Sequence, residues 1–170
     1  MQTVGRLLKD PTQTKSLVFD WDLGFTQTAP RLACDYWTLR RGSRAMPSRD
    51  DLNPSDMRKF SPHVGLIEIR TDADGQPDYF IRRSGGKWEE IYGQMTGRYL
   101  HQFLPPILEG RWRAVFDAVC ERNAPVCVRS GIEFQGKTWL SAEMFVAPLG
   151  RDGKVDMLLM CFVSWSSSEG

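Results

Sequence analysis

A rigid segment at residues 46–54, with the sequence MPSRDDLNP, most constrains what this chain can fold into. Its two prolines restrict the backbone, and its aspartates and asparagine favour turns and helix starts. Before this segment the apolar residues recur with the period of a helix, whereas after about residue 62 they recur at every second position, as in strands. We therefore interpret residues 46–54 as a joint between a leading helix and a mixed core, and not as a catalytic loop.

The leading helix is predicted over residues 30–41. Its spacing of apolar side chains predicts a buried stripe of Leu32, Tyr36 and Leu39, widened by Trp37. We expect this helix either to form a dimer contact or to transmit a signal from the core. In the second case, we expect the core to move the helix through the joint.

The remainder of the chain predicts strands separated by helices. Period-two stretches indicate strands at residues 64–71 and 79–84 and three more after residue 125, the last of them apolar on both faces and therefore central. Short helical segments and one long helix lie between the two groups. The long helix has a wide apolar stripe, made of Leu108, Trp112, Val115, Phe116 and Val119. This order predicts an α+β fold: a five-stranded antiparallel sheet with helices on one face and an N-terminal helical extension.

We divide the chain into an arm (residues 1–29), flanking helices and joint (30–60), a core (61–165) and a polar tail (166–170). Part of the arm is expected to dock on the core, because its apolar side chains would be costly to leave in water. Trp21 and Trp37 are taken as an exposed aromatic patch, and because such patches usually seek cover they predict a homodimer.

The charge balance excludes several classes of partner. Lys and Arg (22) nearly equal Asp and Glu (21), so the chain lacks the basic excess typical of nucleic-acid binding. No apolar run approaches the roughly 20 residues that a membrane-spanning helix needs. Four dispersed cysteines, with no paired spacing and no secretory signal, indicate reduced thiols in a cytoplasmic protein.

The histidines and glycines support no known catalytic or metal motif. With only His63 and His101, the chain has neither a nucleophilic triad nor a pair of histidines at metal-ligand spacing. His101 is the sole candidate for a haem ligand, although an ordinary core or surface histidine is the better interpretation. The sequence leaves the cofactor unknown.

Five short motifs carry a resemblance to a known family. In chain order they are WTLRRG (37–42), PSRDDLNP (47–54), YFIRRSGG (79–86), YGQMTGRYL (92–100) and APLGRDGKVDMLL (147–159). Each is weak alone, but their order and spacing resemble a family of small stand-alone bacterial PAS proteins over residues 32–163. The cysteine motif of the flavin-binding LOV subclass is absent between residues 86 and 104, so flavin photochemistry is not expected.

The resemblance implies a cytoplasmic, non-enzymatic sensory or interaction module that binds a small molecule or a partner protein. Its pocket would lie between the helices and the sheet, and the candidate lining residues are Arg82, Trp88, Tyr92, Phe103, Trp112 and Met144. The same aromatic residues would equally suit a solid core. Because the chain has no room for a second domain, the signal is expected to pass in trans to a partner. A small lyase- or isomerase-type enzyme and a purely structural dimerisation domain are the alternatives.

Overall fold

The five predicted strands form the centre of one antiparallel sheet. The computed structural model describes residues 13–14, 17–134 and 138–168, and within them the sheet order β5-β6-β7-β3-β4 makes β7 the central strand, as predicted. The bounds of these strands are β3 Val64–Thr71, β4 Pro77–Ser84, β5 Val126–Phe134, β6 Thr138–Arg151 and β7 Lys154–Ser168. Strand β7 thus continues into the expected tail, of which residues 169–170 lie outside the described ranges.

The arm adds two short strands to the edge of this sheet. Strands β1 (Gln13–Thr14) and β2 (Val18–Asp20) both pair antiparallel with β5, so the described sheet has seven strands and not five. Strands of two and three residues are too short for a period-two pattern to be visible in the sequence. The arm is therefore docked as expected, although its residues 1–12 and 15–16 lie outside the described ranges.

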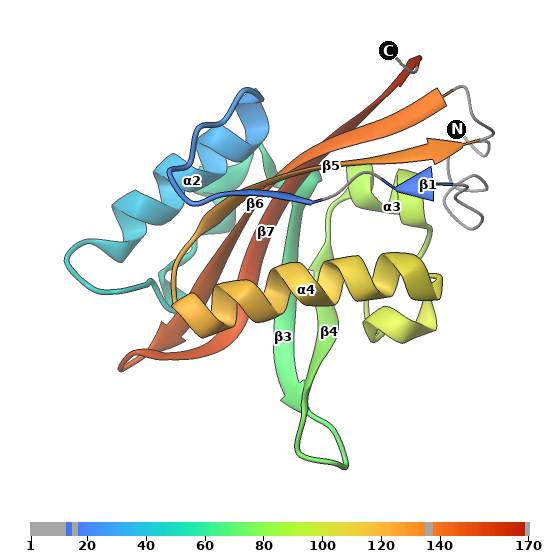
Figure 1. Ribbon diagram of the computed structural model, residues 1–170. Helices are drawn as coiled ribbons and strands as arrows, with labels where there is room; N and C mark the ends of the chain where they lie inside the picture. The colour runs from blue at the N-terminus through green and yellow to red at the C-terminus, as the bar shows by residue number, and fades with distance from the viewer. Residues whose placement is uncertain (1–12, 15–16, 135–137, 169–170) are drawn as a thin grey trace.

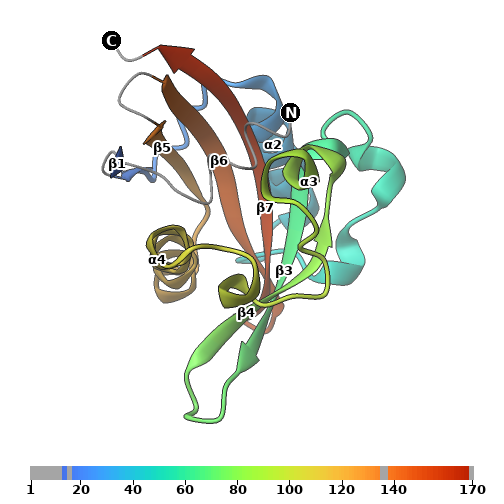
Figure 2. The same cartoon turned by 90° about the vertical axis from the view of Figure 1, so that its right-hand side faces the viewer.

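Both faces of the sheet are covered by helices (Figures 1 and 2). Helices α3 (Gly86–Tyr92) and α4 (Pro106–Arg122), with the 3-10 turn η4 (Leu100–Gln102), pack on one face, as predicted. Helix α2 (Thr28–Arg41) packs with the joint on the opposite face. The stripe predicted for α4 is confirmed, since all five of its residues are buried. No helix in the described part of the chain is both long enough and apolar enough to cross a membrane.

Helix α2 buries most of the predicted stripe, with Tyr36 and Trp37 buried and Leu32 half-buried, but the prediction for Leu39 is wrong. Ala33, Tyr36 and Trp37 are buried against the sheet, whereas Leu39 is 75% exposed, because a helix anchored by Ala33 and Trp37, one turn apart, turns position 39 outward. Trp37 is only 3% exposed, and its indole N–H donates to the carbonyl oxygen of Pro148 at 2.9 Å. The prediction that Trp37 belongs to an exposed patch is therefore wrong, and it no longer supports a homodimer.

The joint contains the 3-10 turn η1 (Arg49–Asp51), and two further 3-10 turns, η2 (Pro54–Met57) and η3 (Ser61–His63), follow at its end and before β3. The carboxylate of Asp51 accepts hydrogen bonds from the backbone N–H (2.8 Å) and hydroxyl (3.0 Å) of Ser48, and it pairs with Arg44 at 2.7 Å. These contacts tie the joint to the end of α2 and make it rigid.

Candidate functional site

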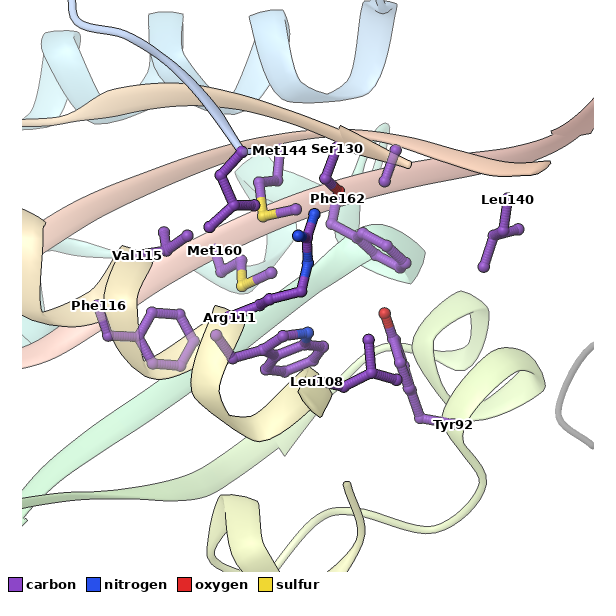
Figure 3. A pocket seen from close by; sticks show the side chains of 13 residues that line it. Tyr92, Leu108, Arg111, Val115, Phe116, Ser130, Leu140, Met144, Met160 and Phe162 are labelled. Carbon is purple, nitrogen blue, oxygen red and sulfur yellow. The ribbon is translucent and has the colours of Figure 1, made fainter. Parts of the chain in front are cut away.

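A small cavity lies between α4 and the sheet (Figure 3). Its volume is about 30 Å³, and it is mostly apolar. The described residues that line it are Leu17, Tyr92, Leu108, Arg111, Trp112, Val115, Phe116, Ser130, Leu140, Ala142, Met144, Met160 and Phe162. The lining side chains with polar groups are Tyr92, Arg111, Trp112 and Ser130. The interior is thus close to solid, with space for two or three water-sized spheres.

An aromatic cluster centred on Trp112 forms one wall of the cavity. The Trp112 ring makes edge contacts with Trp88, Tyr92 and Phe103, at centroid distances of 5.5, 5.0 and 6.1 Å. Four of the six predicted pocket residues therefore meet in one cluster. Tyr92 and Trp112 reach the cavity itself, whereas Trp88 and Phe103 pack behind them. Such perpendicular contacts are the favoured geometry of aromatic pairs and fix the wall in place.

The two predicted residues of the sheet have different positions. Met144 lines the cavity from β6. Arg82 does not reach it, because the alternation of β4 turns Tyr79 and Ile81 inward, both with no exposed surface, and leaves Arg82 on the outside. The expected cavity contact of Arg82 is therefore wrong by one strand position.

Arg111 is the charged residue of the cavity that the sequence interpretation missed. It lies three residues after Leu108 and four before Val115, both of which belong to the buried stripe of α4, and this spacing was the available signal. Its Nη2 atom is buried and has no hydrogen-bond partner among the described residues. Burial lowers the pKa of Arg111 and raises the pKa of the Tyr92 phenol.

The arm closes one side of the cavity. Leu17 contributes to the lining, and the strand that follows it, β2, is held on β5 by backbone pairing. Farther along the arm, Phe19 and Trp21 pack against the same core, and the guanidinium of Arg122 lies over the Trp21 ring at 4.2 Å. Trp21 is therefore half-buried in a contact within the chain, and the exposed patch predicted for it is not found.

A buried carboxylate then holds the arm where it enters α2. Glu143, 1% exposed, accepts hydrogen bonds from the backbone N–H of Thr26 (3.1 Å), the hydroxyl of Thr26 (2.8 Å) and the backbone N–H of Gln27 (2.8 Å). It also pairs with Arg129 at 3.2 Å, and Arg129 donates in turn to the carbonyl oxygen of Gly24. We name Glu143, Arg129, Thr26 and Gln27 the arm clamp. It fixes the residues that immediately precede α2.

The histidines lie outside the cavity. His101 is exposed and stacks on Tyr99 at a centroid distance of 5.9 Å, and it does not line the cavity. His63 is half-buried with its Nδ1 atom 3.2 Å from the carbonyl oxygen of Phe162, and burial lowers its pKa. Within the described ranges, no group of three His, Cys, Asp or Glu residues is placed to hold a metal ion.

A wider groove lies between the far end of α4 and the strands β3 and β4. Its volume is about 620 Å³, and one of its charged lining residues, Arg113, contacts Asp78 at 3.3 Å and Glu109 at 3.2 Å. The phenol of Tyr79 donates to Asp117, and burial raises the Tyr79 pKa. These pairs tie α4 to the strands.

Comparisons with known proteins identify the family to which this fold belongs. The chain matches the family model of the PAS domain over residues 25–163. A search of curated proteins found no match. Among solved structures, the chain is similar to one described as "Structure of an RNA-binding Light-Oxygen-Voltage Receptor", with 14% identity and a TM-score of 0.46. That similarity covers 90% of this chain and 39% of the receptor chain. Because the family match spans most of its length, with the expected sheet and helices in place, this chain belongs to the PAS domain family.

Proposed function

We propose that this PAS domain is a non-enzymatic sensory module that binds a small molecule in the cavity beneath α4 and signals to a partner protein. Membership of the PAS family supports the sensory class. None of the described residues that line the cavity is a carboxylate or an imidazole, so the site is suited to binding and not to acid–base chemistry. The four thiols are unpaired, which is consistent with a reducing compartment such as the cytoplasm.

One observation carries the proposal: the arm contacts both the cavity and the start of α2. Leu17 lines the cavity, and ten residues later the backbone of Gln27 is bound by Glu143. Along β6, Ala142 and Met144 face the cavity, while Glu143 between them faces the arm clamp. Two points of the arm, Leu17 and Gln27, thus lie at sites to which three consecutive residues of β6 contribute: the cavity and the arm clamp.

The small size of the cavity is the reason why ligand binding would move the arm. A space of about 30 Å³ accepts only a very small molecule as it stands. A larger ligand has to displace a wall residue. Leu17 directly precedes an edge strand of three residues, β2, whereas the other lining residues belong to longer helices and strands of the core. Binding is therefore expected to move the arm first.

Helix α2 is the element that would transmit the change. It begins directly after the arm clamp, and Leu39, which is 75% exposed, lies on its outer surface. A shift of the arm would alter how α2 is presented to a partner protein or to a second copy of this chain. The homodimer itself remains a prediction.

The test is a search for the ligand followed by a matched pair of variants. Native mass spectrometry and an absorption spectrum of freshly purified protein would detect a co-purified molecule, and ligand-observed NMR with small fragments would find others. Leu17→Ala enlarges the cavity, whereas Val18→Ala changes a 53% exposed neighbour and is the control. We expect Leu17→Ala alone to bind larger fragments. Identical fragment binding by both variants, with no fragment shifting the NMR signals of cavity residues, would refute the proposal.

A further inference from the structure

The unpaired guanidinium of Arg111 is the feature of the cavity that most narrows the choice of ligand. Figure 3 shows it extending from α4 into the space near Ser130 and Met144. Its Nη2 atom is buried and has no partner among the described residues, and none of the described lining residues carries a negative charge. The Arg111 side chain as a whole is half-buried, but a buried N–H group without a partner is unfavourable, and buried unsatisfied groups often mark the place of an ion.

The neighbouring arginine of the same helix shows the contrast. Arg113, two residues away, pairs with the carboxylates of Asp78 and Glu109 at the rim of the groove. These two carboxylates, one from β4 and one from α4, neutralise Arg113, whereas Arg111 has no carboxylate partner among the described residues. An anion that enters the cavity would supply the missing charge.

The shape and chemistry of the cavity limit which anion fits. The volume of about 30 Å³ corresponds to two or three water-sized spheres, which suits an anion of three or four heavy atoms. A guanidinium binds a planar carboxylate through two parallel N–H donors, a geometry that a spherical halide does not match. The hydroxyls of Tyr92 and Ser130 line the same space as neutral donors, and apolar walls would receive a hydrogen or methyl group.

We propose that the cavity binds a one- or two-carbon carboxylate, of the size of formate or acetate, whose charge is paired with Arg111. This inference rests on the proposed function and names the ligand class of the same site. The phenol of Tyr92, whose ordinary pKa of 10 is raised further by burial, is protonated at neutral pH and can donate to the carboxylate. The walls contributed by Trp112 and Met144 would exclude longer acids unless Leu17 moves.

The experiment titrates the full chain in a buffer whose only anion is too large for the cavity, such as MOPS. Sodium formate and sodium acetate are compared with formamide and acetamide, which have the same shape but no charge, and with sodium chloride. The indole N–H signals of Trp112 and Trp88 in the NMR spectrum report binding close to the cavity, and the melting temperature reports it independently.

We expect saturable shifts with formate and acetate, and affinities at least tenfold lower for the amides and chloride. Arg111→Met should abolish the carboxylate response, and Arg111→Lys should weaken it. Arg82→Met makes the same chemical change at an exposed position and should respond as the wild type does. In the MOPS buffer without added salt, Arg111→Met should melt above the wild type because it removes a buried N–H group that has no partner among the described residues.

Two results would overturn the inference, and a third would overturn the proposed function as well. Equal binding of acetate and acetamide, or of acetate and chloride, would show that charge and planarity do not select the ligand; this comparison needs no variant to fold. Unchanged acetate binding by Arg111→Met would show that Arg111 is not the partner. If neither these probes nor any fragment perturbs the cavity residues of the folded wild type, the cavity is not a ligand site.

Discussion

Replacing Glu143 with alanine is expected to release the arm and to destabilise the whole domain. The substitution removes the acceptor of three hydrogen bonds from Thr26 and Gln27 and the partner of Arg129. Two backbone N–H groups would lose their partner next to the sheet, and the guanidinium would lose its closest carboxylate. The perturbation is local to the arm clamp, because Glu143 lies on the opposite face of β6 from the cavity.

The magnitude follows from the burial of the two charged partners. Removing one member of a buried ion pair costs about 3–5 kcal/mol. Glu143 is 1% exposed but the Arg129 side chain is 34% exposed, and water can compensate for part of its lost contact, so the lower end of the range applies, about 3 kcal/mol. For a domain of this size that corresponds to a fall of roughly 6–12 °C in melting temperature. Glu143→Gln keeps the shape and one acceptor, and should cost about 1–2 kcal/mol.

Urea denaturation followed by tryptophan fluorescence measures the free energy of unfolding, and hydrogen exchange measures protection of the Thr26 and Gln27 amides. Glu121→Ala is the matched control, since this exposed glutamate of α4 forms no side-chain hydrogen bond or ion pair within the described ranges. A Glu143→Ala variant within 0.5 kcal/mol of wild type, with both amides still protected, would show that the arm is held without the clamp.

Three further outcomes are expected. Gly85→Ala should cost about 1–3 kcal/mol in urea denaturation, because its Cβ would meet the backbone of Pro62, whereas Gly86→Ala points into open space and should be neutral or slightly stabilising. The backbone N–H of Ser48, and after it Arg44, lower the pKa of Asp51 from 3.8 to about 2. The stabilising contribution of Asp51 is therefore present above pH 4 and lost as the pH falls from about 4 to 2. In Asp51→Asn, the free energy of unfolding measured by urea denaturation should vary less with pH over that range. Burial raises the pKa of all four thiols, so the native chain should react slowly with a disulfide reagent at pH 8, and the urea-unfolded chain rapidly.

The sequence predicted most of the fold because long periodic segments carry their own signal. The stripe of α4 and the two apolar faces of β7 identified the long helix and the central strand. Because β7 is apolar on both faces, both faces of the sheet have to be covered, and α2 covers the face opposite to α4. Strands β1 and β2 left no pattern, because their pairing depends on the open edge of β5 more than on their own two or three residues.

The candidate site was only partly predictable for a different reason. The aromatic cluster around Trp112 follows from residue type and helical spacing, and the structure assembles it. The prediction for Arg82 was wrong because alternate residues of a strand face opposite sides, and the sequence alone could not show which side of β4 faces the cavity. Arg111 was missed because charged residues are usually solvated, although its spacing from Leu108 places it on the buried stripe. The cavity itself is a small gap left where the side chains do not pack completely, and no sequence pattern encodes a volume of about 30 Å³.

The structure suggests β6, more than the joint, as the place where ligand binding and helix position would be coupled. Met144 and Glu143 are adjacent on one strand, and their side chains point to opposite faces. The strand is paired on both sides, Met144 with Val128 of β5 and with Phe162 of β7, so a ligand that pushes on Met144 has to shift the ladder or rotate this short stretch. Either movement changes the position of the Glu143 carboxylate, whose contacts with Thr26 and Gln27 depend on geometry. The joint, in contrast, is closed by the short contacts of Asp51 and is built to resist movement.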